Sequence, residues 1–294
     1  MNIEMPKDAP KPTTWVLFDL ESAVMDDVAH KRYQKIERWK PHGDNEPSRR
    51  NYEFKNDPLR NPRWTFQTIV TAAVAVMTQH PDGNVQLMTF ETFSAPEYDE
   101  RGIVEALFSL LADVPKGAEL VSWGGAAHDL PILRLAAQKH GLTFPKDWLW
   151  AAFAGDGRSR HLDLARIATG GLKMRQVHHS EFAAALDIPA KITAPAWAVA
   201  RHIYAGRWNT VREICEGDVV TLMLLFARWR QTIDGRASAE VVEDRILRQI
   251  IEMQAGRGYV AELEQHRADR LKVRIAQAAN DTAWQELCSD GEAA

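Results

Sequence analysis

Apolar and polar positions alternate along the first half of the chain in a way that predicts strands. Thr13–Asp19 is a β-rich apolar run that ends in acidic residues, and two more strands are expected over Thr68–Thr78 and Val85–Phe93. Residues 80–84, His-Pro-Asp-Gly-Asn, have the composition of a hairpin turn between the last two. These three strands can therefore form an antiparallel meander.

Helical periodicity follows, interrupted by one more strand. Glu100–Leu111 carries its apolar residues on one face of a helix, and Ala118–Trp123 is a short apolar strand. The next helix begins at His128 or Asp129 and ends near His140, before Gly141. Further helical segments are expected over residues 146–153, 161–167, 181–186 and from 209 or 210 to about 233. Four or five strands with helices on both faces imply an α/β fold, in which the fourth strand joins a mixed sheet by a crossover.

The pattern changes after Gly235, where polar helices replace the alternation of strands and helices. Val242, Ile246 and Ile250 share one stripe of the first of these helices. We therefore expect a loose N-terminal tail over 1–12, an α/β domain over 13–235 and a helical C-terminal extension over 236–294. The extension could pack back on the domain, bind a partner or serve self-association through its helices, and the sequence leaves these alternatives open.

Composition excludes several classes of protein. Of the 294 residues, 45% are hydrophobic and 26% are charged, so the chain can bury a sizeable core and is not disordered overall. It has no run of the roughly 18–20 apolar residues that a membrane helix needs, and its polar amino end does not resemble a secretory signal. Two cysteines, Cys215 and Cys288, cannot by themselves form a disulfide framework or a metal cluster. We expect a soluble, cytoplasmic protein without a membrane partner.

The charge distribution bears on nucleic-acid binding. A net charge of −4 gives no overall attraction for a polyanion, which would have to meet a local basic patch or bound metal ions. The segment 25–63 interleaves basic and aromatic residues, among them Lys31, Arg32, Tyr33 and Trp39. Such a segment could hold a single strand by pairing phosphates with cations and stacking bases on rings. A solvated helix over Val28–Trp39, followed by a loop, is the alternative.

Four acidic positions stand out by their surroundings. Asp19 and Glu21 lie two residues apart at the end of the first strand, so both side chains point to one face. Their mutual repulsion requires a cation, and a hard divalent ion with oxygen ligands is the common solution. Asp129 follows a glycine pair after a strand, and Asp218 lies in the long helix beside Gly217, which lets another part of the chain approach closely. Each acid also has an ordinary explanation, as a solvated strand end, a helix cap or an exposed helical residue.

The surroundings of these acids resemble motifs of a known superfamily. The three segments, in chain order, are Phe18-Asp19-Leu20-Glu21, then Ser122-Trp123-Gly124-Gly125 with His128-Asp129-Leu130-Pro131, and Cys215-Glu216-Gly217-Asp218-Val219. They resemble the three motifs of the DEDD 3′–5′ exonucleases, which have the ribonuclease-H-like fold. The most similar subgroup is the predicted 3′–5′ exonucleases related to the proofreading domain of family-B DNA polymerases. Residues 161–164, 186–191 and 204–207 also look like this subgroup, so the resemblance covers about residues 13–235.

The resemblance implies a two-metal nuclease that acts on single-stranded ends, with DNA as the expected substrate and nucleoside 5′-monophosphates as products. Asp19, Glu21, Asp129 and Asp218 would bind two divalent ions, Mg²⁺ or Mn²⁺, with Asp19 bridging the pair. Such ions activate the attacking water and stabilise the leaving 3′-oxygen. The residues expected to contact the nucleic acid are Leu20, Trp123, Gly125, His128, Arg160 and His161.

The last motif departs from the superfamily pattern. Its members carry a tyrosine or histidine about one turn before the final acid, which orients or deprotonates the attacking water. Here Ile214 lies four residues before Asp218, and Glu213 lies five before it. A missing general base typically lowers the rate by ~10²–10⁴-fold, so we expect reduced activity. Glu213 or Glu216 could substitute, although both have the pattern of solvent-exposed helical residues.

The second motif departs as well, because its usual asparagine and its aromatic residue are Gly124 and His128. His128 either contacts a terminal nucleotide or is a partly exposed residue at a helix start, and we expect His178 and His179 on the surface. Three functions therefore remain: an exonuclease, a catalytically weak or inactive exonuclease-like domain that binds nucleic acid or a protein, and an RNA 3′-end trimming enzyme. The last differs from the first only in sugar recognition, which the sequence does not reveal.

Overall fold

A computed structural model describes most of the chain after residue 12. The described residues are 13–23, 64–81, 83–152, 160–171, 174–175, 177–194, 198–234 and 238–291, of which 152, 234 and 281–291 are described by their backbone alone. The tail 1–12, the basic and aromatic segment 25–63 and the helix expected over Val28–Trp39 lie outside these residues. The expectations for them stay predictions.

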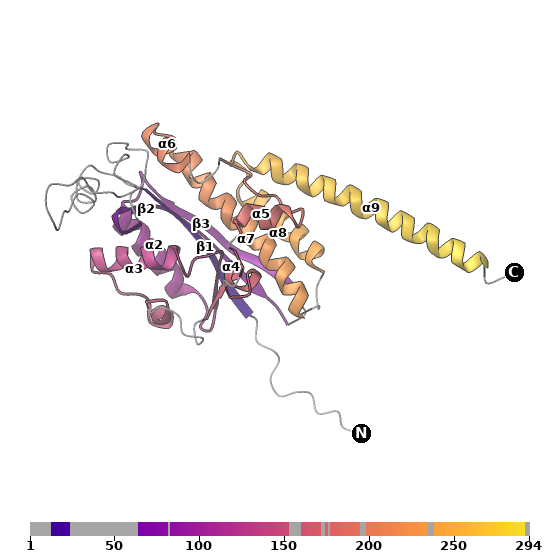
Figure 1. Ribbon diagram of the computed structural model, residues 1–294, viewed down its shortest axis with the longest axis horizontal. Coiled ribbons are helices and arrows are strands. Elements are labelled where there is room, and N and C mark those ends of the chain that lie inside the picture. The colour runs from indigo at the N-terminus through magenta and orange to yellow at the C-terminus, as the bar shows by residue number, and fades with distance from the viewer. Residues whose placement is uncertain are drawn as a thin grey trace, which may run out of the picture.

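A five-stranded mixed sheet lies at the centre of the fold (Figure 1). Its strands are β1 (Thr13–Ala23), β2 (Thr68–Gln79), β3 (Val85–Ser94), β4 (Glu119–Ser122) and β5 (His161–Asp163). The first three form the expected antiparallel meander, and β4 and β5 join the other side of β1 in parallel, so the order is β3-β2-β1-β4-β5. This is the ribonuclease-H-like arrangement, and the expected fold class is confirmed.

One expected element has a different structure. Residues 161–163, expected to begin a helix, form β5, whose residues pair with Leu120–Ser122 of β4. The helix α4 (Leu164–Ala168) begins only after Asp163, whose side chain caps it. Three residues are too few to show the period-two pattern of a strand, so β5 cannot be recognised from its own residues.

Helices cover both faces of the sheet (Figure 1). On one face lie α2 (Glu100–Asp113), α3 (Asp129–His140) and the 3₁₀ segment η3 (Lys146–Ala152). On the other lie α4, α5 (His179–Ala184), α6 (Val199–Tyr204), α7 (Trp208–Asp234) and α8 (Ala239–Met253). The helix α7 begins one or two residues before the position expected for it. None of the described helices has the length and apolar character needed to cross a membrane.

Strand β1 is apolar on both sides because it lies between the two helical layers. Trp15 and Leu17 pack with residues of α7 in one cluster, whereas Val16 and Phe18 pack with residues of α2 and α3 in another. A central strand that is covered on both faces reads as a continuous apolar run, as the sequence of β1 does. Since the side chains alternate, every second residue of β1 faces α7.

The last helix, α9 (Val260–Gly291), projects beyond the rest of the molecule (Figure 1). Its first turn packs on the body through Val260 and Leu263, which are buried. Further along, Leu271, Val273 and Ile275 are exposed. Self-association through the C-terminal helices stays a prediction.

The edge strand β3 is covered by the helix α8 and the residue that follows it, which form hydrogen bonds with some of its backbone groups. The side-chain amide of Gln249 accepts a hydrogen bond from the Leu87 N–H (3.1 Å) and donates one to the Leu87 carbonyl (3.4 Å). The amide of Gln254 donates to the Phe90 carbonyl (3.3 Å). An open edge strand is a template for pairing with other chains. The two glutamine side chains therefore provide hydrogen-bond partners that another strand would otherwise provide for Leu87 and Phe90 of β3.

Replacing Gln249 by alanine is expected to lower the free energy of unfolding by about 1–2 kcal/mol, because two backbone groups of β3 lose their partner. The open edge is also expected to increase self-association at high protein concentration. Urea unfolding and light scattering measure the two effects. Gln265→Ala, which removes an exposed glutamine of α9 bonded to Asp269, is the matched control. Equal stability of the two variants would contradict the role of Gln249.

Candidate functional site

The acidic site begins where β1 exchanges apolar for acidic side chains. Asp19 and Glu21 continue the face of β1 that carries Trp15 and Leu17 toward α7. Asp218 reaches the same place from α7, about two hundred residues later in the chain. One carboxylate oxygen of each of Asp19, Glu21 and Asp218 lies within 4.8 Å of the others. These three acids, the acidic triad, therefore share one partly buried location.

Asp129 approaches the triad from the start of α3. Its side chain is buried, and it lines a hollow of about 680 Å³ whose wall also includes Asp19, Glu21 and Asp218. Asp129 is not part of the triad of mutually close oxygens. Its charge nevertheless acts on the triad, because it contributes to raising the pKa of both Asp19 and Glu21. The structure thus brings all four acids to one hollow.

Burial and repulsion together make these carboxyl groups hard to ionise. Burial, followed by the charges of Asp129 and Glu21, raises the pKa of Asp19 well above its usual range. Burial and the charge of Asp218 raise the pKa of Glu21 to about 8, although Lys191 opposes this shift. Burial also raises the pKa of Asp129. A cation at this site would relieve repulsion that the protein otherwise bears.

These shifts predict that the metal-free protein loses stability as the pH rises from about 6.5 to about 8. In this range the folded protein keeps a proton on Glu21 that the unfolded chain has released, so each increase in pH favours unfolding. Below about pH 6.5 the buried His161 and His179 have the opposite influence on stability. Burial lowers their pKa to about 4, so between pH 4 and 6.5 the unfolded chain binds more protons at these two residues and their contribution to stability rises with pH. Thermal melts in a chelator across this range measure the slope. A Glu21→Gln variant should show a flatter slope, and a wild-type stability that rises with pH would contradict the prediction.

Asp163 fixes the turn that precedes Asp129. Its two carboxylate oxygens accept hydrogen bonds from the N–H groups of Gly124 (2.8 Å) and Ala126 (3.2 Å). The parallel pairing of β4 with β5 places Asp163 directly beside Ser122, where β4 ends. The turn that leads into α3 is thus held against the end of β5 by two hydrogen bonds, which limits where the Asp129 carboxylate can lie.

Gly125 has no room for a side chain. A Cβ atom there would lie 2.5 Å from the Ser122 Oγ and 3.0 Å from the Asp129 Oδ2. The Gly125 N–H donates to the same Ser122 Oγ at 3.1 Å. The second glycine of this turn therefore permits the close contact between the end of β4 and the start of α3.

Gly125→Ala is expected to displace Asp129 and to weaken divalent-ion binding, with a loss of about 1–3 kcal/mol in the free energy of unfolding from the steric overlap. Calorimetric titration with Mn²⁺ and urea unfolding measure the two effects. Gly256→Ala is the matched control, because a Cβ there meets no atom within 4 Å. A Gly125→Ala variant that binds Mn²⁺ as tightly as the wild type would contradict this expectation.

Gly217 brings another segment next to Asp218, which confirms the interpretation of this glycine. A Cβ at 217 would lie 3.2 Å from the Ile192 Cγ1 and 3.4 Å from the Thr193 Oγ1. The neighbouring Lys191 places its Nζ 2.9 Å from both carboxylate oxygens of Asp218. The resemblance had pointed to residues 186–191 only as a connecting feature, without this ion pair.

His179 lies in the site, and its expected place on the surface is wrong. The residue is 9% exposed, and its Nδ1 lies 3.9 Å from the Asp218 Oδ1. Its ring lies against that of Trp123, with centroids 5.5 Å apart. Among the described residues its Nε2 has no hydrogen-bond partner, and burial keeps the imidazole neutral at pH 7 by lowering its pKa to about 4. The preceding His178 is exposed and caps α5.

None of the residues considered as a general base lines the hollow. Ile214 is buried among apolar residues, including Ala23 and Val70. Glu213 accepts a hydrogen bond from the Gly258 N–H at 2.8 Å. Glu216, expected to be solvent-exposed, is fully buried and bonded to Thr92, Arg257 and Tyr259. That expectation is wrong because the partners of Glu216 come from distant parts of the chain.

The residues expected to contact substrate lie at different distances from the acids. Leu20, Trp123 and His128 line the hollow, and the His128 Nδ1 lies 3.2 Å from an Asp129 oxygen. Gly125 lies within the turn before α3 and does not line the hollow. Arg160 is exposed and does not line the hollow. His161 bonds the Ser122 Oγ through its Nε2 at 2.7 Å. The roles of these residues in binding stay predictions.

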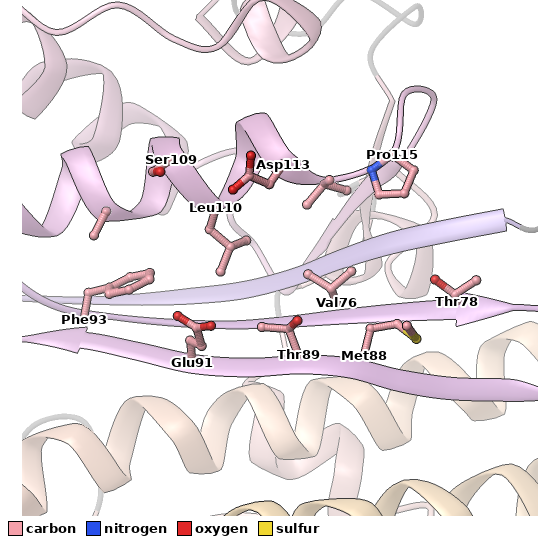
Figure 2. A pocket seen from close by; sticks show the side chains of 12 residues that line it. Val76, Thr78, Met88, Thr89, Glu91, Phe93, Ser109, Leu110, Asp113 and Pro115 are labelled. Atoms are coloured by element: carbon pink, nitrogen blue, oxygen red, sulfur yellow. The ribbon is translucent and has the colours of Figure 1, made fainter.

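A second hollow, of about 500 Å³, lies between α2 and strands β2 and β3 (Figure 2). Leu110 and Phe93 point into it from the helix and the sheet, and Glu91 and Asp113 lie on opposite sides. No residue of the triad lines it. Its mostly apolar wall has no group of carboxylates suited to a cation, so the candidate site is the acidic hollow.

The order and directions of the five strands define a protein with the ribonuclease-H-like exonuclease fold. A family model described as "predicted 3′–5′ exonuclease related to the exonuclease domain of PolB" matches residues 61–266. The chain belongs to this family. The match includes the segments that carry Asp129 and Asp218 but begins after β1. Asp19 and Glu21 therefore lie outside the matched residues, and it is the structure that places them beside the other two acids.

Solved structures with similar folds include two larger proteins. One is the family B DNA polymerase from the hyperthermophilic archaeon Pyrobaculum calidifontis, with 16% identity and a TM-score of 0.42 over 84% of this chain and 30% of that chain. Another is E. coli exonuclease I in complex with a 5cy-dT13 oligonucleotide, with 12% identity and a TM-score of 0.38 over 76% of this chain and 41% of that chain. The matched part is less than half the length of either protein. No curated protein matches the sequence.

Proposed function

We propose that the protein is a metal-dependent 3′–5′ exonuclease that hydrolyses single-stranded nucleic acid, with DNA as the preferred substrate, to nucleoside 5′-monophosphates. The observation that carries the proposal is the meeting of Asp19, Glu21 and Asp218 within 4.8 Å, with Asp129 on the wall of the same hollow. Membership of a family of predicted exonucleases supports it.

The donor set suits Mg²⁺ or Mn²⁺. Both ions are hard cations that prefer carboxylate oxygens to sulfur. The nearby Cys215 thiol is not a competing ligand, because burial raises its pKa and it donates to the Asp19 carbonyl at 3.2 Å. Asp19, Glu21 and Asp218 would hold one ion, and Asp19 with Asp129 a second. Two bound ions supply an activated water and stabilise the leaving 3′-oxygen.

The other walls of the hollow suit a terminal nucleotide. Trp123 offers apolar surface against which a base or sugar can pack, and His128 lines the same hollow with its side chain 57% exposed. His179 carries a neutral imidazole beside Asp218 and can donate or accept a hydrogen bond without adding charge. These groups would hold the 3′ end while the acids hold the ions.

The helix α7 supplies no general base to this hollow, since Glu213, Ile214 and Glu216 all lie elsewhere. Turnover would therefore depend on the bound ions, at a rate ~10²–10⁴-fold below that of a site with a general base. The burial of Ile214 also favours a second function, namely a weak or inactive exonuclease-like domain that binds nucleic acid or a protein partner. The cytoplasmic location expected from the sequence is a separate point, and it stays a prediction.

One assay separates these functions. The purified protein is incubated with single-stranded DNA labelled at the 5′ end, in Mn²⁺, Mg²⁺ or a chelator, beside an Asp19→Asn variant. Metal-dependent shortening from the 3′ end, absent in the variant, is the expected result, and released 5′-monophosphates identify the bond that is cleaved. The same sequence as RNA tests the sugar preference. Binding without shortening would support the inactive domain instead.

A further inference from the structure

Lys191 places a positive charge inside the acidic hollow. Its Nζ lies 2.9 Å from both carboxylate oxygens of Asp218, and its side chain, which is 22% exposed, lines the hollow. The same charge opposes the rise in the pKa of Glu21, so it acts on the triad beyond its direct partner. The ammonium group is thus a cation positioned where three acids meet.

The backbone at Lys191 has an unusual conformation. Its φ is +57°, in the left-handed region that non-glycine residues rarely adopt. Ile192 and Thr193 pack on Gly217 of α7, the residue next to Asp218. Strained backbone conformations persist only where the surrounding contacts hold them, and they concentrate at functional sites. Close packing on α7 therefore keeps the strained residue, and its charge, at the triad.

We propose that Lys191 is a built-in counter-ion of the metal-free site, which a divalent ion must displace from Asp218 in order to bind. The inference rests on the proposed metal-dependent function. A divalent ion coordinates carboxylate oxygens at about 2.0–2.6 Å, and an ammonium group that bonds both oxygens of Asp218 occupies the space beside them. In the absence of a metal ion the ammonium offsets the repulsion among the acids. Metal affinity is then set by the exchange of one cation for another.

A second lysine–carboxylate pair provides a comparison. Lys139 bonds Glu100, a buried carboxylate that also accepts hydrogen bonds from the Ile69 N–H and from His140. Glu100 is not part of the triad and does not line the acidic hollow. Removing Lys139 therefore breaks an ion pair to a buried acid without changing the charge at the proposed metal site.

The test compares Mn²⁺ binding by the full chain in three variants, Lys191→Met, Lys191→Asn and Lys139→Met, at about pH 8. Methionine keeps the apolar stem of Lys191, whereas asparagine tolerates the left-handed backbone, so their shared effect reports the lost charge. Calorimetry or electron paramagnetic resonance gives the dissociation constants without any measurement of activity. Both Lys191 variants are expected to bind Mn²⁺ about tenfold more tightly than the wild type, and Lys139→Met is expected to bind it equally.

Thermal melts give a second readout. In a chelator the Lys191 variants should melt below the wild type, and Mn²⁺ should raise their melting temperature by more. If the methionine variant does not fold, the asparagine variant carries the comparison. Unchanged or weaker Mn²⁺ binding by the folded variants, beside a wild type that binds Mn²⁺, would overturn the counter-ion role alone. A wild type that binds no Mn²⁺ would overturn the proposed function and this inference with it.

Discussion

Asp19→Asn is expected to abolish exonuclease activity and at the same time to stabilise the metal-free protein. Asparagine keeps the shape of the side chain but removes the charge from the residue that we place between the two ions. Activity should fall at least ~10³-fold, which corresponds to about 4 kcal/mol of transition-state stabilisation. Stability should rise by about 1–3 kcal/mol at neutral pH, because burial and the charge of Asp129 make the Asp19 carboxyl harder to ionise in the folded protein than in the unfolded chain, a cost that a neutral amide avoids.

Opposite changes in activity and stability distinguish a functional acid from a structural one, whose removal lowers both. Initial rates on labelled single strands give the first quantity, and urea unfolding in a chelator gives the second. Glu91→Gln removes an exposed carboxylate from strand β3, on the wall of the other hollow, and should change neither. An Asp19→Asn variant that keeps its activity, or that unfolds more easily than the wild type, would show that Asp19 is not part of a repulsive metal site.

The parts of the site that could be predicted from the sequence are those with local rules. The period of a β-strand places Asp19 and Glu21 on one face whatever the rest of the fold does. A glycine inside a helix indicates a close approach, and Gly217 has one. The meander of the first three strands follows from their apolar runs and a hairpin turn, which the pairing of β1, β2 and β3 confirms. Local patterns thus predict the antiparallel half of the sheet and the shared face of Asp19 and Glu21.

The parts that were missed depend on contacts between distant segments. His179 looks like a polar residue at the start of a short helix, and only the packing of its ring on Trp123 shows that it is buried. Lys191 has no local partner, because Asp218 lies 27 residues further along the chain. Glu216 has the spacing of a solvent-facing residue in the sequence, but in the structure Arg257 and Tyr259 of the turn after α8 cover it. No periodicity encodes such pairs.

Arg257→Ala is expected to be among the most destabilising single substitutions in the protein. The Glu216 side chain is fully buried, and the Arg257 Nη2 lies 2.8 Å from its Oε1. Thr92 donates to the same oxygen at 2.8 Å, and the Tyr259 hydroxyl donates to the other at 3.1 Å. Two neutral donors do not offset a buried negative charge, so removing the guanidinium should cost about 3–5 kcal/mol. Urea unfolding measures the loss.

A second substitution at the acid tests whether the unpaired charge is the cause. Glu216→Gln combined with Arg257→Ala should recover much of the lost stability, because an amide needs no countercharge and its oxygen still accepts from Thr92 or Tyr259. Arg267→Ala is the matched control: its partner Asp244 has a side chain that is 38% exposed, and an exposed pair contributes about 1 kcal/mol or less. Equal losses for the two arginines, or a double variant no more stable than Arg257→Ala, would exclude a buried charge at Glu216. Because Glu216 lies two residues before Asp218 on α7, a large loss confined to Arg257 would also mean that the turn between α8 and α9 fixes the helix that carries the last acid of the site.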